Sequence, residues 1–142
     1  MPVTFSFSDD GEEVELRLVG TITSEEYVEF FRGALSTSSP PRRIRTTLMD
    51  LLEGDTSQLT LEAVREVAAL TAAEAHRNPG LRALAAVVRD PLTFGLTRQW
   101  NLFTNDPRNR LEIFTTRESA ERWLRQQREL APEDGEAPAR GA

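Results

Sequence analysis

The stretch at residues 81–88, "LRALAAVV", constrains the fold of this chain more than any other feature. Apart from Arg82 it is continuously apolar, which is the composition of a β-strand covered on both faces. Such strands occur in mostly parallel sheets that are flanked by helices. The stretch therefore predicts the central strand of an α/β fold.

Two segments near the N-terminus have the two-residue period of strands with one buried face. Val3, Phe5 and Phe7 alternate with small polar residues, and residues 14–19 alternate in the same way. The turn sequence "DDGEE" between them predicts a β-hairpin.

Helical and strand patterns alternate after this hairpin. Good N-capping residues precede four helical segments: Thr23, Thr60, Asp90 and Thr115. Three further strands are predicted at residues 43–52, 81–88 and 110–115. The order β-β-α-β-α-β-α-β-α predicts an α/β fold with a mostly parallel five-stranded sheet and four helices. We expect a single domain over residues 1–129 and a disordered tail over 130–142, which lacks bulky apolar residues beyond its first position.

Composition excludes several classes of chemistry. The chain has 142 residues, a net charge of −6 and no cysteine, and all seventeen of its basic residues are arginine. Thiolate nucleophiles, Schiff bases and the lysine of a phosphate-binding loop are thereby ruled out. Its apolar runs are too short to span a bilayer, and its first residues do not form a signal peptide. We expect a cytosolic protein without membrane insertion.

Charged and metal-ligating residues give few further signals. The acidic net charge disfavours nucleic-acid binding, and the cluster Arg42, Arg43 and Arg45 lacks interleaved aromatic residues. The single histidine, His76, falls in the last turn of a predicted helix, where a cation suits the dipole. Asp50, Glu53 and Asp55 are expected to converge on one loop, but acidic loops are usually only solvated. We expect no metal and no cofactor.

The segment "DPLTFGLTRQW" at residues 90–100 predicts a helix that follows the central strand. Its predicted inward stripe consists of Leu92, Leu96, Trp100 and Phe103. Gly95 is unusual, because glycine in a helix costs about 1 kcal/mol relative to alanine. We expect that it allows a neighbouring element to pack closely; contact with a ligand or partner is the alternative.

The C-terminal half resembles bacterial domains of the STAS-like group. The resemblance rests on "FGLTRQW", the short strand "LEIFT" and the helix "RESAERWL", with Phe94, Gly95, Arg98 and Trp123 at matching positions. The segments "VELRLVGTITSEEYVEFFRGAL" and "TTLMDLLEGD", the latter with Asp50, are similar to the opening and central strand of the group. The resemblance covers roughly residues 12–126. It implies the fold of anti-sigma-factor antagonists and of lipid-binding SEC14-like domains, and no reaction.

One departure from this group concerns phosphorylation. Phosphorylatable antagonists carry a serine or threonine followed closely by Gly-Leu after the Asp-ending strand, and this phrase is missing here. Thr56, Ser57 and Thr60 are available in that loop. We interpret Ser57 and Thr60 as helix caps.

Two functions remain open from the sequence. The first is a non-enzymatic regulatory module that docks a protein partner or forms a homodimer. The alternative is a domain that binds a small molecule or lipid in an apolar pocket between the sheet and the helix with Phe94 and Trp100. The residues proposed for a ligand or partner surface are Asp50, Asp55, Thr56, Ser57, Phe94, Gly95 and Arg98.

Overall fold

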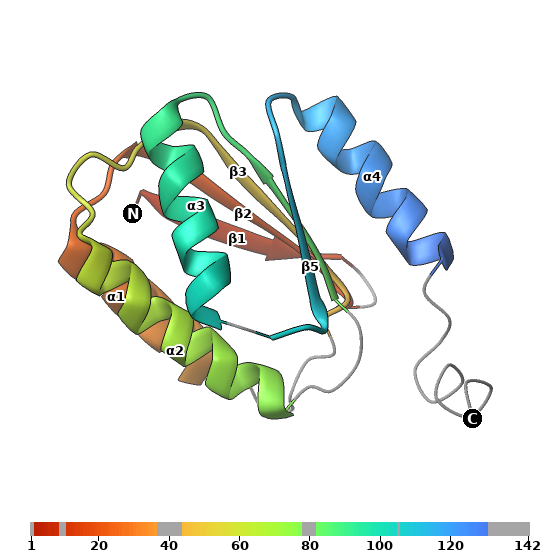
Figure 1. Cartoon of the computed structure of the whole chain (residues 1–142), viewed down its shortest axis with the longest axis horizontal. Coiled ribbons are helices and arrows are strands. Elements are labelled where there is room, and N and C mark those ends of the chain that lie inside the picture. The colour runs from red at the N-terminus through yellow and green to blue at the C-terminus, as the bar shows by residue number, and fades with distance from the viewer. Residues whose placement is uncertain (1, 9–10, 37–43, 78–81, 105, 131–142) are drawn as a thin grey trace.

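The structure is a computed structural model that describes residues 2–8, 11–36, 44–77, 82–104 and 106–130 (Figure 1). Within these residues the chain forms five strands and four helices. The strands are β1 Val3–Phe7, β2 Glu13–Thr21, β3 Thr46–Asp55, β4 Arg82–Val87 and β5 Asn109–Phe114. The helices are α1 Ser24–Ser36, α2 Leu61–Arg77, α3 Pro91–Thr104 and α4 Arg117–Leu130.

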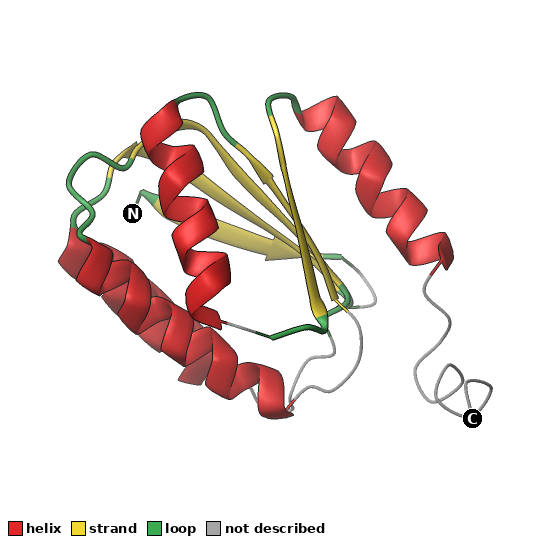
Figure 2. Cartoon of the chain, viewed as in Figure 1, coloured by secondary structure: helices red, strands yellow, loops and turns green. Residues whose placement is uncertain are grey.

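The strands form one sheet in the order β1-β2-β3-β4-β5, which is also their order in the sequence. The hairpin strands β1 and β2 pair antiparallel, and all other neighbouring strands pair parallel. Helices α1, α2 and α3 lie on one face of the sheet and α4 lies on the other (Figures 1 and 2). The predicted α/β fold with an initial hairpin is confirmed.

Side-chain caps fix three of the helix starts that were predicted. The Thr23 Oγ1 accepts a hydrogen bond from the Glu26 amide at 3.1 Å, and the Glu26 carboxylate accepts one from the Thr23 amide at 2.9 Å. This reciprocal pair is a capping box. Thr60 and Asp90 accept from the amides three residues on, at 3.1 and 2.8 Å.

Two predicted boundaries are wrong. The strand predicted at 43–52 lies three residues further on, so Glu53 and Asp55 belong to β3 and do not form a loop with Asp50. The last helix is capped by Thr116 rather than Thr115, because the Ser119 amide donates to the Thr116 Oγ1 at 3.2 Å. The side chain of His76, the residues Arg42 and Arg43 and the tail from 131 lie outside the described residues.

The face of the sheet under α4 holds a well-packed core. Leu48, Ala85, Val87 and Ala120 are buried there, and Trp123 packs against them with its ring 5.8 Å from that of Phe114. Small residues on β4 let α4 approach closely. Strand β4 is buried on both faces from Ala83 onward, as its composition predicted.

Helix α3 turns a different face inward from the one predicted. Its buried residues are Thr93, Thr97 and Thr104, whereas Leu92 is 50% exposed. Threonine is tolerated there because the Thr97 and Thr104 hydroxyls donate to backbone carbonyls at 2.8 Å. The predicted stripe is therefore only partly correct: Leu96 and Trp100 face the sheet and Leu92 does not.

Candidate functional site

A cavity of about 310 Å³ separates the sheet from the layer formed by α1, α2 and α3. Alternate residues of β1, β2, β3 and β4 face it, because successive side chains in a strand point to opposite faces, and β5 contributes Asn109. Its wall is predominantly apolar. Among the wall residues are Phe5, Phe7, Leu16, Phe30, Met49 and Leu84.

The helices over this cavity are tied to one another. Arg32 of α1 forms an ion pair with Glu66 of α2 at 2.6 Å, and Arg65 of α2 lies 4.9 Å from the centre of the Phe103 ring of α3. The Ser24 hydroxyl also accepts from the Thr60 amide, which joins the starts of α1 and α2. These contacts hold the three helices as a layer that spans the cavity.

Aromatic rings form the wall beside the N-terminal hairpin. The Phe5 ring lies 5.2 Å from the Phe7 ring and 5.5 Å from the Phe30 ring, both in edge-to-face geometry. Phe31 and Tyr27 extend the cluster along α1. Removal from water raises the pKa of the Tyr27 phenol above its ordinary value. Phe5 is 41% exposed, so the cavity borders solvent on this side.

Threonine hydroxyls line the wall at the carboxyl edge of the sheet. The hydroxyl oxygens of Thr56 and Thr93 lie 2.8 Å apart, and the Thr93 hydroxyl also donates to the Asp90 carboxylate at 3.1 Å. Thr71 donates to the carbonyls of its own helix. Over the part of the chain that is described, every fully buried side-chain oxygen and nitrogen has a hydrogen-bond partner. The hydroxyls of Thr56 and Thr93 are therefore already paired within the protein.

Charged and amide side chains line the cavity at its amino-edge corner. Arg82 of β4, Asn109 of β5 and Glu74 of α2 all belong to the wall. The Arg82 Nε donates to the Asn109 side-chain oxygen at 2.8 Å, and its Nη2 lies 3.0 Å from the Asp106 carboxylate. The Arg82 and Asp106 side chains are 13% and 12% exposed. At this corner, Arg82 and Asp106 are thus nearly buried and paired with each other beside the apolar cavity.

The structure separates the residues that the sequence proposed for a site. Thr56 lies in the cavity wall, while Asp55 accepts hydrogen bonds from the Thr21 hydroxyl and the Ser57 amide outside it. These bonds, chiefly those from Ser57, hold the pKa of Asp55 below its ordinary value. Ser57 is exposed and caps no helix, which corrects its interpretation as a cap.

Phe94, Gly95 and Arg98 occupy the outer face of α3. Phe94 is 41% exposed and Arg98 is also exposed. A methyl group added at Gly95 would meet no atom within 4 Å outside its own helix turn. The expectation that Gly95 permits close packing is therefore wrong. Close packing is required instead at Gly54, where an added methyl group would collide with the Leu18 side chain.

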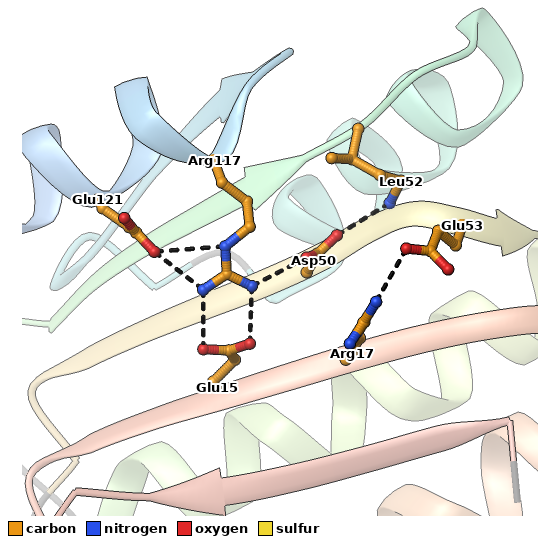
Figure 3. Close-up of polar contacts among 7 residues, drawn as sticks. All are labelled: Glu15, Arg17, Asp50, Leu52, Glu53, Arg117 and Glu121. Carbon is orange, nitrogen blue, oxygen red and sulfur yellow. Dashed lines mark hydrogen bonds and ion pairs between the residues drawn. The ribbon is translucent and has the colours of Figure 1, made fainter.

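Asp50 lies on the opposite face of the sheet, under α4 (Figure 3). Its Oδ2 accepts from the Arg117 Nη1 at 2.9 Å, and its Oδ1 accepts from the Leu52 amide at 3.2 Å. The register between β2 and β3 shifts just there, between Arg17 and Val19. Asp50 thus accepts a hydrogen bond from a backbone amide at the place where the pairing of β2 and β3 is irregular.

Arg117, at the start of α4, is the centre of this charged network. Its guanidinium also forms two hydrogen bonds with Glu15, at 2.8 and 3.0 Å, and contacts Glu121 (Figure 3). These carboxylates, Glu15 first, raise the pKa of Arg117, and Arg117 in turn lowers the pKa of Glu15. The network attaches α4 to β2 and β3, so the role of Asp50 is structural.

Sequence reasoning missed the corner residues and Arg117. Arg82 was the one charged residue inside an otherwise apolar strand, which was an available signal. Asn109 and Arg117 carry no comparable local pattern.

In the described ranges, no three histidine, aspartate or glutamate side chains are grouped as metal ligands would be. No described helix has the length and apolar character of a membrane span.

The chain is similar to a solved structure that is informative about its fold. This is the crystal structure of an uncharacterised DUF3478-family protein with a SpoIIAA-like fold from Shewanella loihica PV-4. The TM-score is 0.56 at 22% sequence identity, and the match covers 86% of this chain and 91% of that one. No family model and no curated protein matches the sequence. The chain therefore has the SpoIIAA-like fold, which is that of STAS domains and anti-sigma-factor antagonists.

Proposed function

We propose that this protein binds an apolar small molecule between its sheet and the layer of α1, α2 and α3. The observation that carries the proposal is the cavity of about 310 Å³. Protein interiors are normally packed as densely as organic crystals, with few voids larger than a water molecule. Ligand pockets typically have volumes of about 300–1,000 Å³ and mostly apolar walls.

The volume also indicates the size of the ligand. An engineered apolar cavity of about 150 Å³ stays dry and binds benzene. The present cavity of about 310 Å³ is roughly twice as large. By this scaling it fits a molecule of about a dozen non-hydrogen atoms.

A binding role without catalysis is supported by the chemistry of the wall. The sequence contains neither cysteine nor lysine. The hydroxyls of Thr71 and Thr97 donate to backbone carbonyls of their own helices. A hydroxyl acts as a nucleophile when an adjacent general base takes its proton, and a backbone carbonyl is not such a base. The Thr93 hydroxyl donates to the Asp90 carboxylate, but Thr93 is 2% exposed and its hydroxyl also contacts that of Thr56.

Native mass spectrometry of gently purified protein tests this proposal. We expect one bound apolar molecule per chain, carried from the cell or taken up from added decanol. The variant Thr47→Phe places a ring in the cavity, because Thr47 lies in its wall, and should abolish uptake. The matched control is Thr4→Phe, at an exposed position of the edge strand β1, which should bind like the wild type. Equal uptake by both variants would contradict the proposal.

A second candidate function is docking of another protein on the outer face of α3. Leu92, Phe94 and Leu102 are 50%, 41% and 63% exposed, and Arg98 lies among them. Clustered exposed apolar residues are typical of interaction surfaces. If the partner is a second copy, sedimentation should show a dimer that Leu102→Glu dissociates. A wild-type monomer at every concentration would contradict self-association.

A further inference from the structure

Aromatic side chains are concentrated in the wall of the cavity. They make up 7% of the sequence. Among the 28 described residues that line the cavity, six are aromatic: Phe5, Phe7, Tyr27, Phe30, Phe31 and Trp100. An apolar wall can be built from aliphatic side chains alone, so this concentration of rings is a separate property of the cavity.

Five of these rings form a continuous cluster that runs from β1 to α1. The Phe5 ring lies between those of Phe7 and Phe30, with ring centres 5.2 and 5.5 Å away. The Phe31 ring lies 5.1 Å from that of Phe30 and 5.4 Å from that of Tyr27. All four pairs are edge-to-face. Rings pair in this way because the face of an aromatic ring is negative and its edge is positive.

Two further wall residues outside this cluster also favour contact with a ring. Trp100 belongs to α3, so aromatic side chains reach the cavity from β1, α1 and α3. Met49 of β3 lines the cavity as well. Its thioether sulfur is polarizable and makes favourable contacts with aromatic rings. Groups that interact well with an aromatic ligand are therefore present on the sheet and on two of the covering helices.

On the basis of the proposed function, we infer that the ligand is a flat aromatic molecule of about two fused rings. Such a molecule gains edge-to-face or offset-stacked contacts with the wall, which add to the effect of the area that it buries. A saturated molecule with the same carbon skeleton gains only the hydrophobic effect, which is proportional to its apolar area. Two fused rings also fit the cavity of about 310 Å³, which holds about a dozen non-hydrogen atoms.

Headspace gas chromatography over solutions of the protein tests this inference with naphthalene and decalin. The two hydrocarbons share one carbon skeleton, and decalin has the larger apolar surface, so the hydrophobic effect alone favours decalin. We expect naphthalene to bind about tenfold more tightly, a difference that corresponds to about 1.4 kcal/mol. If decalin binds as tightly as naphthalene, the inference is overturned while the proposed function stands. If neither binds, or if Thr47→Phe binds both like the wild type, the proposed function itself fails.

Substitutions in the cluster make the test specific to its rings. Phe30→Leu removes a central ring, and Phe5→Leu removes a half-exposed one that the fold should tolerate losing. Each should lower the preference for naphthalene over decalin by about threefold. The control Phe114→Leu removes a ring on the opposite face of the sheet and should leave the preference unchanged.

A further variant separates the rings from the space around them. Leu84→Ala enlarges the cavity without removing a ring, because Leu84 lies in its wall. The preference for naphthalene should therefore fall less in Leu84→Ala than in Phe30→Leu. An equal fall in both variants, or no fall in either phenylalanine variant, would overturn the inference. A thermal unfolding curve for each variant verifies that the protein remains folded.

Discussion

The two faces of the sheet are packed in different ways. Under α4, small residues such as Ala85 and Ala120 allow close contact, and Arg117 attaches the helix to β2 and β3 by charged hydrogen bonds. Under α1, α2 and α3, larger side chains border a cavity of about 310 Å³. The strands are shared, so the difference arises from how the helices approach the sheet. Each face has a buried core, and the face under α1, α2 and α3 also leaves a cavity.

Truncating one leucine on each face of the sheet should give the largest difference in the free energy of unfolding. Leu48 and Leu84 are 6% and 9% exposed, on the α4 face and in the cavity wall respectively. Leu48→Ala should lower the free energy of unfolding by about 4 kcal/mol, and Leu84→Ala by about 2, because Leu84 already borders the cavity. Urea denaturation measures both. Equal losses would mean that the cavity side is packed as tightly as the other.

Two glycine-to-alanine substitutions should change the free energy of unfolding in opposite directions. Gly54→Ala should cost about 1–3 kcal/mol, since the added methyl group collides with the buried Leu18. Gly95→Ala should stabilise the protein by up to about 1 kcal/mol, since the methyl group meets open space and alanine favours the helix. Thermal unfolding distinguishes them. A destabilised Gly95→Ala protein would restore the packing role that the sequence suggested.

The charged network under α4 should give a modest effect on the free energy of unfolding, and one that depends on pH. Arg117→Gln should cost about 1–2 kcal/mol at neutral pH, allowing for its partial exposure to solvent. Arg117 lowers the folded-state pKa of Glu15. Stabilisation from such a carboxylate is present above its unfolded pKa of about 4.3 and is lost as the pH falls through the folded value.

Denaturation of both proteins at pH 7 and near pH 3 therefore checks this account. The difference between wild type and Arg117→Gln should shrink at the lower pH. The control Arg17→Gln breaks an exposed ion pair with Glu53 on the same face and should cost less than about 0.5 kcal/mol. A difference that is unchanged at low pH would exclude the pairing of Arg117 with Glu15 as its cause.

Much of the fold could be predicted because local patterns determine it. Alternation in residues 3–8 and 14–19 identified the hairpin, and the caps Thr23, Thr60 and Asp90 located three helices. The bounds of β3 could not be predicted, since its irregular pairing with β2 depends on tertiary contacts of Asp50.

Less of the candidate site than of the fold could be predicted from the sequence. The sequence suggested a pocket beside Trp100, and Trp100 does line the cavity. Periodicity shows which side chains face the helices and not how far from the sheet the helices lie, so the volume could not be foreseen. The inward threonines of α3 were missed because their hydroxyls are satisfied within the helix, which makes them compatible with burial.

Binding of an apolar ligand in the cavity can be tested through Trp100. This residue lies in the cavity wall, whereas Trp123 packs on the opposite face. In the variant Trp123→Phe the tryptophan emission comes from Trp100 alone, and titration with decanol should change it saturably with one molecule bound per chain. The same titration of the Trp123→Phe, Thr47→Phe double variant should produce no change. A Trp100 emission that stays constant up to the solubility limit of decanol would contradict the account.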